Sequence, residues 1–454
     1  MTDESRGRVP LVAAATFVAT AVALRALSGA IPRPIVLLVS VPLLLWGFAA
    51  QQRLSAVGRA ALLGCAGGLA AILALFSARV VWESVVQPPQ WDFLGFWLNG
   101  RVAASRLNFY ETAHATELAA PYNPSEEFRR EILDVGFWYP PPSIFIFLPL
   151  GFADLATAAA LWYTAMVVIL GACVLILWRT FLPRSGLFGL LIATALTLGI
   201  FGTRSTFQFG QDNFLTLLAL LLFWTRRDRM TGGIALALGM LVKPFLGGFL
   251  LYLALRRRWR TLAGVAVGLT GMCALTLAVF GWAPFQSYLS RADYAQLPPW
   301  VYTEPSNQSL LASILRVAPG LTRAGTPPMG QPAFLASAFA LCCVTIWCVW
   351  RGQERDEWAA ASTLLLALLI YPASQMFYCI LLVVPFLILW TDRDRVPGGG
   401  AAVAVGIGVL YALMDYRGGR HVFVATLATW IVAVILGGVA PRRRPALDAG
   451  PGVR

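Results

Sequence analysis

Charged side chains are scarce in this 454-residue sequence. Asp, Glu, Lys and Arg together make up 13% of it, and 58% is hydrophobic, whereas soluble globular chains carry about 25% charged residues. Apolar stretches recur along the whole length, so lipid is the expected solvent for most of the chain. The composition excludes a soluble enzyme with one membrane anchor and predicts an all-α polytopic membrane protein, a single domain over residues 1–454.

Histidine and paired cysteines are lacking too. Only His114 and His421 occur, which argues against a histidine-based metal centre, and we expect neither a metal nor another cofactor. The seven cysteines fall inside apolar runs without the spacing of zinc sites, so we interpret them as small core side chains. No Walker motif, dinucleotide fingerprint or nucleophile elbow occurs, and nucleotide chemistry therefore has no support.

Positive charge, net +13, is concentrated in short links between the apolar runs. This distribution is typical of cytoplasmic links under the positive-inside rule and not of a nucleic-acid surface. If these links are cytoplasmic, the chain is predicted to cross the membrane about fourteen times with both termini inside. Residues 439–454 then form a cytoplasmic tail. Residues 1–59 then hold two N-terminal helices, near 11–30 and 34–50, and the apolar stretch 143–152 is expected to be re-entrant or interfacial.

Two long segments, 83–142 and 281–332, are less apolar, and the alternation of crossings places both outside the cell. Three hairpins have arms of only about 11 to 15 residues, where a crossing needs about 20. Their polar tips, at 204–213, 243–244 and 372–375, are therefore expected within the depth of the membrane. Polar backbone at that depth is tolerated where it lines a cavity, so the sequence predicts a cavity open to the outer face.

Asp92 is the candidate catalytic residue. The aromatic residues Trp91, Phe93, Phe96 and Trp97 surround it in the sequence. A carboxylate that aromatic rings partly remove from water binds its proton more tightly, which suits a general base. The alternative is an ordinary interfacial aspartate beside an aromatic belt.

Lys243 is the candidate for binding a phosphate group. It interrupts an apolar stretch from 232 to 255, at a cost of about 2.5 to 3.5 kcal/mol unless an anion compensates it. Few carboxylates lie in the membrane, so we predict a ligand phosphate as its partner, with a structural ion pair as the alternative. Arg204, Gln211 and Asn213 supply further donors, although this cluster is equally typical of an N-cap formed by Asp212 or Asn213.

The predicted substrate-binding residues come from the outer segments and the third tip. They are Trp91, Trp97, Tyr139, Asn307, Gln308 and Ser374. The run Asn307-Gln308-Ser309 is as typical of a helix start as of a sugar site. The alternative interpretation of the FWYPPPS run from 137 to 143 is likewise that it begins a helix.

Five short motifs follow one another in a specific order: WDFLGFW (91–97), WYPPPSIF (138–145), GQDNFLTLLALLL (210–222), LVKPFLGGFLLYLALRRRWR (241–260) and NQSLLASILR (307–316). Together they resemble glycosyltransferase family 87 of the GT-C superfamily. The essential aspartate of that family corresponds to Asp92, its lysine before proline to Lys243, and its Gly-Gln-x-Asn and Asn-Gln-Ser segments to residues 210–213 and 307–309. The family pattern differs at Phe377 in YPASQMFY (371–378), where a histidine is expected.

The resemblance implies an inverting GT-C glycosyltransferase with an extracytoplasmic active site in a bacterial inner membrane. Its donor would be a polyprenyl-phosphate mannose or arabinofuranose, its acceptor a glycolipid or glycan, and nucleic acid no partner. Two alternatives remain open. A transporter or flippase of lipid-linked sugar would use the same polar tips without a base, and internal inverted repeats, which the sequence does not display, would favour it. An inactive scaffold in envelope assembly is the other.

Overall fold

The computed structural model describes residues 3–89, 91–291, 299–322, 326–352 and 355–439. Over these residues the chain forms helices joined by short links, and the one β-bridge pairs Asn307 with Gln375. The prediction of an all-α membrane protein is confirmed at this level. The predicted tail, 439–454, lies from residue 440 onward outside the described residues.

Among the described residues, six helices are long and apolar enough to cross a membrane, and a seventh span results if the bent pair of α9 and α10 is one crossing. Such helices satisfy their backbone hydrogen bonds internally, as lipid requires. The six are α1 (Asp3–Ala30), α2 (Arg33–Ala50), α3 (Ala56–Val86), α8 (Leu155–Phe181), α14 (Trp259–Phe280) and α18 (Pro332–Arg351).

The remaining apolar helices are shorter than a full crossing, as the short hairpin arms predict. They are α9 (Gly186–Gly199), α11 (Asn213–Thr225), α12 (Met230–Val242), α13 (Gly248–Leu255), α19 (Asp356–Ile370), α20 (Val383–Thr391), α21 (Gly399–Asp415) and α22 (Val422–Val434). The short helix α10 (Phe201–Phe209), which follows α9, is mostly polar. A helix needs about 20 residues to span the hydrocarbon layer. The total of about fourteen crossings therefore stays a prediction.

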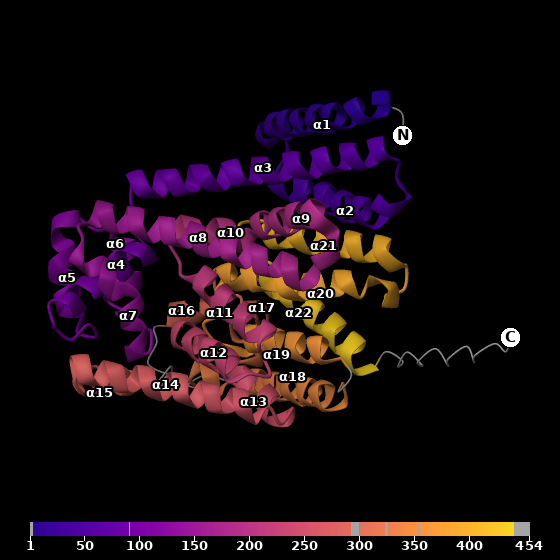
Figure 1. The fold of residues 1–454 in the computed structure, drawn as a ribbon. Coiled ribbons are helices and arrows are strands. Elements are labelled where there is room, and N and C mark those ends of the chain that lie inside the picture. The colour runs from indigo at the N-terminus through magenta and orange to yellow at the C-terminus, as the bar shows by residue number, and fades with distance from the viewer. Residues whose placement is uncertain (1–2, 90, 292–298, 323–325, 353–354, 440–454) are drawn as a thin grey trace.

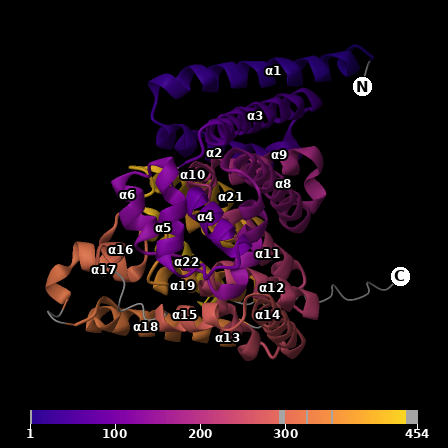
Figure 2. The ribbon, with the colours of Figure 1, turned by 90° about the vertical axis from the view of Figure 1, so that its left-hand side faces the viewer.

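The two segments predicted to lie outside the cell, 83–142 and 281–332, contain short helices over their described residues. These are α4 (Asp92–Ala104), α5 (Thr112–Ala119), α6 (Glu126–Phe128), α15 (Ala283–Arg291), α16 (Pro299–Thr303) and α17 (Leu310–Val317). Figure 1 shows α4, α5, α6 and α7 together at the left, opposite the side on which α1 begins. Figure 2, turned so that this end faces the viewer, shows α4, α5 and α6 in front of the bundle.

The apolar stretch 143–152 forms α7 (Ile144–Phe147) and the 3-10 turn η5 (Leu148–Phe152), preceded by the turn η4 (Pro141–Ser143). It is too short to cross a bilayer core of about 30 Å, in keeping with the expected re-entrant or interfacial segment. It packs against α4 and so contributes to positioning that helix.

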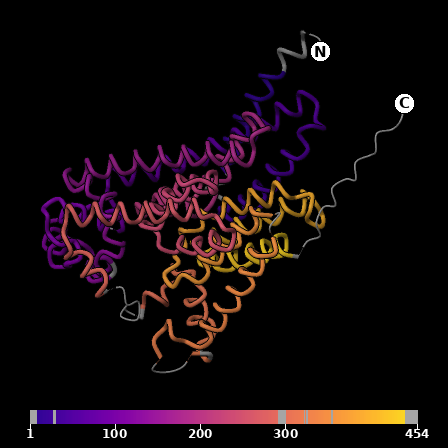
Figure 3. Tube along the Cα trace, turned by 60° about the horizontal axis from the view of Figure 1, so that its bottom comes forward, coloured from indigo at the N-terminus to yellow at the C-terminus, as the bar shows by residue number. Residues whose placement is uncertain are grey.

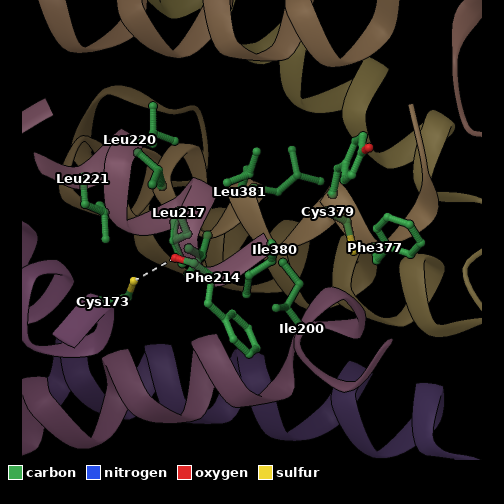
Figure 4. Close-up of a cluster of buried hydrophobic side chains, with 14 of the residues drawn as sticks. Cys173, Ile200, Phe214, Leu217, Leu220, Leu221, Phe377, Cys379, Ile380 and Leu381 are labelled. Carbon is green, nitrogen blue, oxygen red and sulfur yellow. Dashed lines mark hydrogen bonds between the residues drawn. The ribbon is translucent and has the colours of Figure 1, made fainter. Parts of the chain in front are cut away.

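A continuous apolar core joins the helices (Figure 4). Phe214, Leu217 and Leu220 of α11 pack near Ile380 and Leu381 of the 3-10 turn η11 (Met376–Leu382). Three cysteines behave as the small core side chains that the sequence predicts, since Cys173, Cys348 and Cys379 are buried. That prediction is wrong for Cys65 and Cys343, which are exposed on their helices.

The N-terminal helices form a layer along one side of the bundle. Helix α1 packs along α3, and α2 packs along α21. Figure 3 shows this N-terminal segment extending from one edge of the molecule. The described part of residues 1–59 holds α1, α2 and the first residues of α3.

Candidate active site

A cavity of about 430 Å³ lies where α4 meets the tips of the three predicted hairpins. Each tip contributes to it: Gln211 from the first, Lys243 and Pro244 from the second, and Tyr371 to Tyr378 in part from the third. Its wall is rich in aromatic rings, and its charged, amide and hydroxyl side chains are Asp92, Asn99, Glu127, Tyr139, Gln211, Lys243, Glu304, Ser306, Tyr371, Gln375 and Tyr378. An apolar pocket with a few convergent polar groups is the usual form of a binding site.

Asp92 is the first residue of α4, and close backbone packing fixes that helix. Gly100 of α4 faces Gly151 of η5, where a Cβ atom on Gly100 would lie 2.3 Å from the carbonyl oxygen of Phe147. No side chain fits between the two backbones. Beside this contact the rings of Phe96 and Phe147 stack with their centroids 4.3 Å apart, so the start of α4 is held against α7.

The Asp92 carboxyl faces the cavity and binds a proton more tightly than usual. Burial raises the pKa of Asp92 to about 6, while a hydrogen bond from Gln211 and the charge of Lys243 act in the opposite direction. Desolvation disfavours the charged form of a carboxyl, which explains the sign. A carboxylate with this pKa is ionised at neutral pH and still accepts a proton readily.

Lys243 is buried in the kink between α12 and the turn η7 (Pro244–Gly247), with 4% of its surface exposed. Its Nζ lies 3.0 Å from Oδ1 of Asp212 and donates a hydrogen bond of 2.9 Å to the hydroxyl of Tyr139. The rings of Tyr139 and Tyr378 lie 4.9 and 5.0 Å from the ammonium group, within the range of cation–π attraction.

The ion pair corrects one expectation from the sequence. Lys243 was expected to find few carboxylates in the membrane, yet Asp212 supplies one and is itself fully buried. Asp212 precedes α11, but its side chain makes no capping hydrogen bond. It points instead at the neighbouring hairpin, because the chain reverses direction at Gly210.

Gly210 makes this reversal possible. Its φ is +69°, a left-handed conformation that favours glycine, and a Cβ atom there would lie 2.4 Å from the Cβ of Phe93. Its carbonyl oxygen accepts a hydrogen bond of 2.8 Å from Nε1 of Trp162. The turn therefore touches α4 directly beside Asp92.

Gln211 follows this turn and connects the two charged candidates. Its side chain hydrogen-bonds to the Asp92 carboxyl, and its Oε1 lies 3.4 Å from Nζ of Lys243. Of the four predicted donor-phosphate residues, Gln211 and Lys243 line the cavity.

The other two, Arg204 and Asn213, do not. Arg204 lies on the exposed side of α10 and lines a different cavity. Asn213 is buried at the start of α11, where its Nδ2 donates to Oγ1 of Thr206 at 3.0 Å. The helical phase of α10 thus directs Arg204 away from the cavity that Lys243 lines, and the start of α11 holds Asn213 inside the core.

Of the predicted substrate-binding residues, Trp91 and Tyr139 line the cavity. Trp97 of α4 does not line the cavity. Its ring is buried, and its Nε1 donates a hydrogen bond of 3.1 Å to the carbonyl oxygen of Ala153. Phe377, in the place of the expected histidine, lines the cavity and packs against Phe209 and Tyr378.

Asn307, Gln308 and Ser374 form the support behind one wall. Nδ2 of Asn307 donates to the carbonyl oxygen of Pro372 at 2.8 Å, and the backbone N–H of Gln308 donates to the carbonyl oxygen of Ser374 at 2.6 Å. Ser309 caps α17 through a bond of 3.1 Å from the N–H of Ala312, so the helix-start alternative holds for this motif. None of these side chains lines the cavity, which Ser306 and Gln375 border instead.

Sequence reasoning missed Asp212 and Tyr378 as members of the site. The available signal for Asp212 was the combination of a buried lysine in one short hairpin and an aspartate in the tip of the preceding one. For Tyr378 no local pattern distinguishes it from other aromatic residues of the membrane helices.

A comparison with protein families identifies the family of part of the chain. The family model of glycosyltransferase family 87 matches residues 137–372, just over half of the chain. The matched region contains Tyr139, Gln211, Asp212 and Lys243, and Asp92 lies before it. No curated protein and no solved structure matches the chain.

Proposed function

The chain belongs to glycosyltransferase family 87, and on this premise we propose that it transfers mannose or arabinofuranose from a polyprenyl-phosphate donor to a glycolipid or glycan acceptor. The transfer proceeds with inversion at the anomeric carbon. It takes place on the extracytoplasmic face of a bacterial inner membrane that the chain crosses about fourteen times, with both termini in the cytoplasm.

One observation carries the proposal: Asp92 and Lys243, far apart in the sequence, border the same cavity. A carboxyl group with a raised pKa and a buried ammonium group are the two components that a one-step displacement of a sugar from a phosphate requires.

Asp92 acts as the general base. Its carboxylate takes the proton of an acceptor hydroxyl as that oxygen forms a bond to the anomeric carbon. The bond between the anomeric carbon and the phosphate oxygen breaks on the opposite face, and the phosphate leaves with the electron pair. The products are the glycosylated acceptor, polyprenyl phosphate and a protonated Asp92.

Lys243 stabilises the charge that develops on the departing phosphate. Its ammonium group has three donors, of which two are directed at Asp212 and Tyr139 and the third makes the long contact of 3.4 Å with Gln211. A phosphate oxygen in the place of the Gln211 carbonyl would give Lys243 a stronger, charge-assisted bond. Asp212 then serves to hold the ammonium group in position.

The proposed activity is tested with membranes that contain the protein, a radiolabelled polyprenyl-phosphate sugar and an acceptor lipid extract. The expected result is label in a new glycolipid, with an anomeric configuration opposite to that of the donor by NMR. Label that crosses the membrane without leaving its polyprenyl carrier would indicate transport instead. Absence of both transfer and transport would indicate a scaffold.

A further inference from the structure

A second cavity, of about 390 Å³, lies between α2, α3 and α10. It shares no lining residue with the candidate active site. Figure 1 shows the layer of α1, α2 and α3 beside α10, where this cavity forms.

The lining of this cavity is amphipathic. Ten of its fifteen residues are apolar, and those on α3 begin at Leu69 and continue along the helix to Val80. The charged residues border it at the start of α2, near the end of α3 and on α10, and they are Arg33, Arg79, Glu83 and Arg204. A ligand complementary to such a lining has an apolar chain and an ionised head.

The charges around the cavity do not cancel. Nη1 of Arg33 lies 3.1 Å from Oδ1 of Asp415, and Nε of Arg79 lies 2.7 Å from Oε1 of Glu83, so both of these arginines are paired. Arg204 is exposed and forms no ion pair with any residue that the structure describes. One positive charge is therefore left in excess at the head of an apolar cavity.

We propose that this cavity binds an anionic phospholipid of the bilayer, with its headgroup phosphate against Arg204 and an acyl chain along α3. A planar guanidinium group binds two phosphate oxygens at once, and it does so most strongly where water is scarce. The single negative charge of a phosphodiester equals the excess charge of the cavity. Basic pockets between membrane helices bind anionic headgroups by the same physics.

The polyprenyl-phosphate sugar donor fits this second cavity less well than a phospholipid does. With its phosphate at Arg204, its anomeric carbon would lie in a cavity that Asp92 does not border. The phospholipid site is thus separate from catalysis and independent of the proposed function.

Native mass spectrometry of the purified full chain in detergent, titrated with phosphatidylglycerol or phosphatidylcholine, tests the proposal. We expect a preference for phosphatidylglycerol that Arg204→Ala weakens about five- to ten-fold. Arg204→Lys, which keeps the charge but not the two-oxygen contact, weakens it less, and Arg420→Ala leaves it unchanged. Arg420 is a matched control because it is exposed and lines neither cavity.

Three results would overturn the proposal. One is equal phosphatidylglycerol binding by the wild type and a folded Arg204→Ala protein, judged by an unchanged melting temperature. Another is displacement of the lipid by millimolar inorganic phosphate, which would mean a site for free phosphate. The third is tighter, Arg204-dependent binding of polyprenyl phosphate, which would assign the cavity to the donor.

Discussion

One ammonium group acts on two carboxyl groups in the candidate site. Lys243 is paired with Asp212 at 3.0 Å, and its charge also acts on Asp92. Burial raises the pKa of Asp92, the charge of Lys243 lowers it, and the charge of Asp212 raises it and so offsets part of the effect of Lys243. An incoming phosphate adds a further negative charge and would strengthen Asp92 as a base.

The pH dependence of sugar transfer follows from the pKa of Asp92. Because burial raises this pKa to about 6, the carboxyl is protonated and unable to act as a base at lower pH. We expect kcat/KM to rise with pH through about 6 and to level off above about 7. The measurement is the initial rate of label transfer between pH 5 and 8, and a profile that stays flat across this range contradicts the assignment.

We expect substitutions of Lys243 and Asp212 to have strongly non-additive effects on the free energy of unfolding. Removal of one partner leaves a buried charge uncompensated, so Asp212→Asn or Lys243→Met alone should each cost about 3 to 5 kcal/mol. The double variant should recover part of that loss, because neither charge is then left alone. Thermal unfolding of the four proteins in detergent measures the coupling.

A matched surface pair serves as the control for this cycle. Arg79 and Glu83 are 2.7 Å apart and largely exposed, so Glu83→Gln should leave the melting temperature unchanged. Strictly additive losses in the buried cycle would show that Lys243 and Asp212 do not depend on one another.

The sequence predicted two charged residues that line this cavity, Asp92 and Lys243, and missed Asp212, the ion-pair partner of Lys243. Asp92 and Lys243 stand out because a charge beside aromatic rings or within an apolar run is costly. Asp212 does not, because an aspartate before a helix has the local role of an N-cap. Arg204 was predicted to bind the same phosphate as Lys243. The sequence does not reveal which side of α10 carries its side chain, and the structure directs it to another cavity.

Among the elements, α4 and three hairpin tips form the site. The prediction that short arms bring polar tips together inside the protein agrees with the cavity they line. The sequence could not predict how α4 is held, because that depends on contact between Gly100 and Gly151 across the fold. The two long, less apolar segments of the sequence, 83–142 and 281–332, form short helices over their described residues.

A side chain at position 100 should displace Asp92, and so reduce transfer activity, more than it destabilises the helix bundle. In Gly100→Ala the new Cβ would meet the Phe147 carbonyl oxygen at 2.3 Å, and we expect α4 to shift at a cost of about 1 to 3 kcal/mol, with a loss of transfer activity. Gly271→Ala is the control, since no atom lies within 4 Å of a Cβ at that position. Equal activity of both variants would show that the Gly100 contact does not position Asp92.

For the whole molecule, helix α1 begins on one side, and the cluster of α4 to α7 lies on the opposite side (Figure 1). The positive-inside rule predicts that the first side faces the cytoplasm. This prediction uses only the order of basic links and apolar runs along the sequence.

Labelling of single introduced cysteines tests the orientation. Asp134 and Asp394 are both exposed, in the outer segment and in the link between α20 and α21. We expect a membrane-impermeant maleimide to label Asp134→Cys in intact cells and Asp394→Cys only after the membrane is permeabilised. The protein without an added cysteine is the control for its seven native thiols, and the reverse labelling pattern would place the candidate site in the cytoplasm.

The measurement that tests the central claim most directly is the transfer rate of Asp92→Asn in membranes that contain normal amounts of the variant. Loss of the general base predicts a decrease of at least about 100-fold, whereas Asp134→Asn, an exposed aspartate outside the cavity, keeps the wild-type rate. A rate for Asp92→Asn within a few-fold of the wild type would contradict the role of this carboxylate and the mechanism built on it.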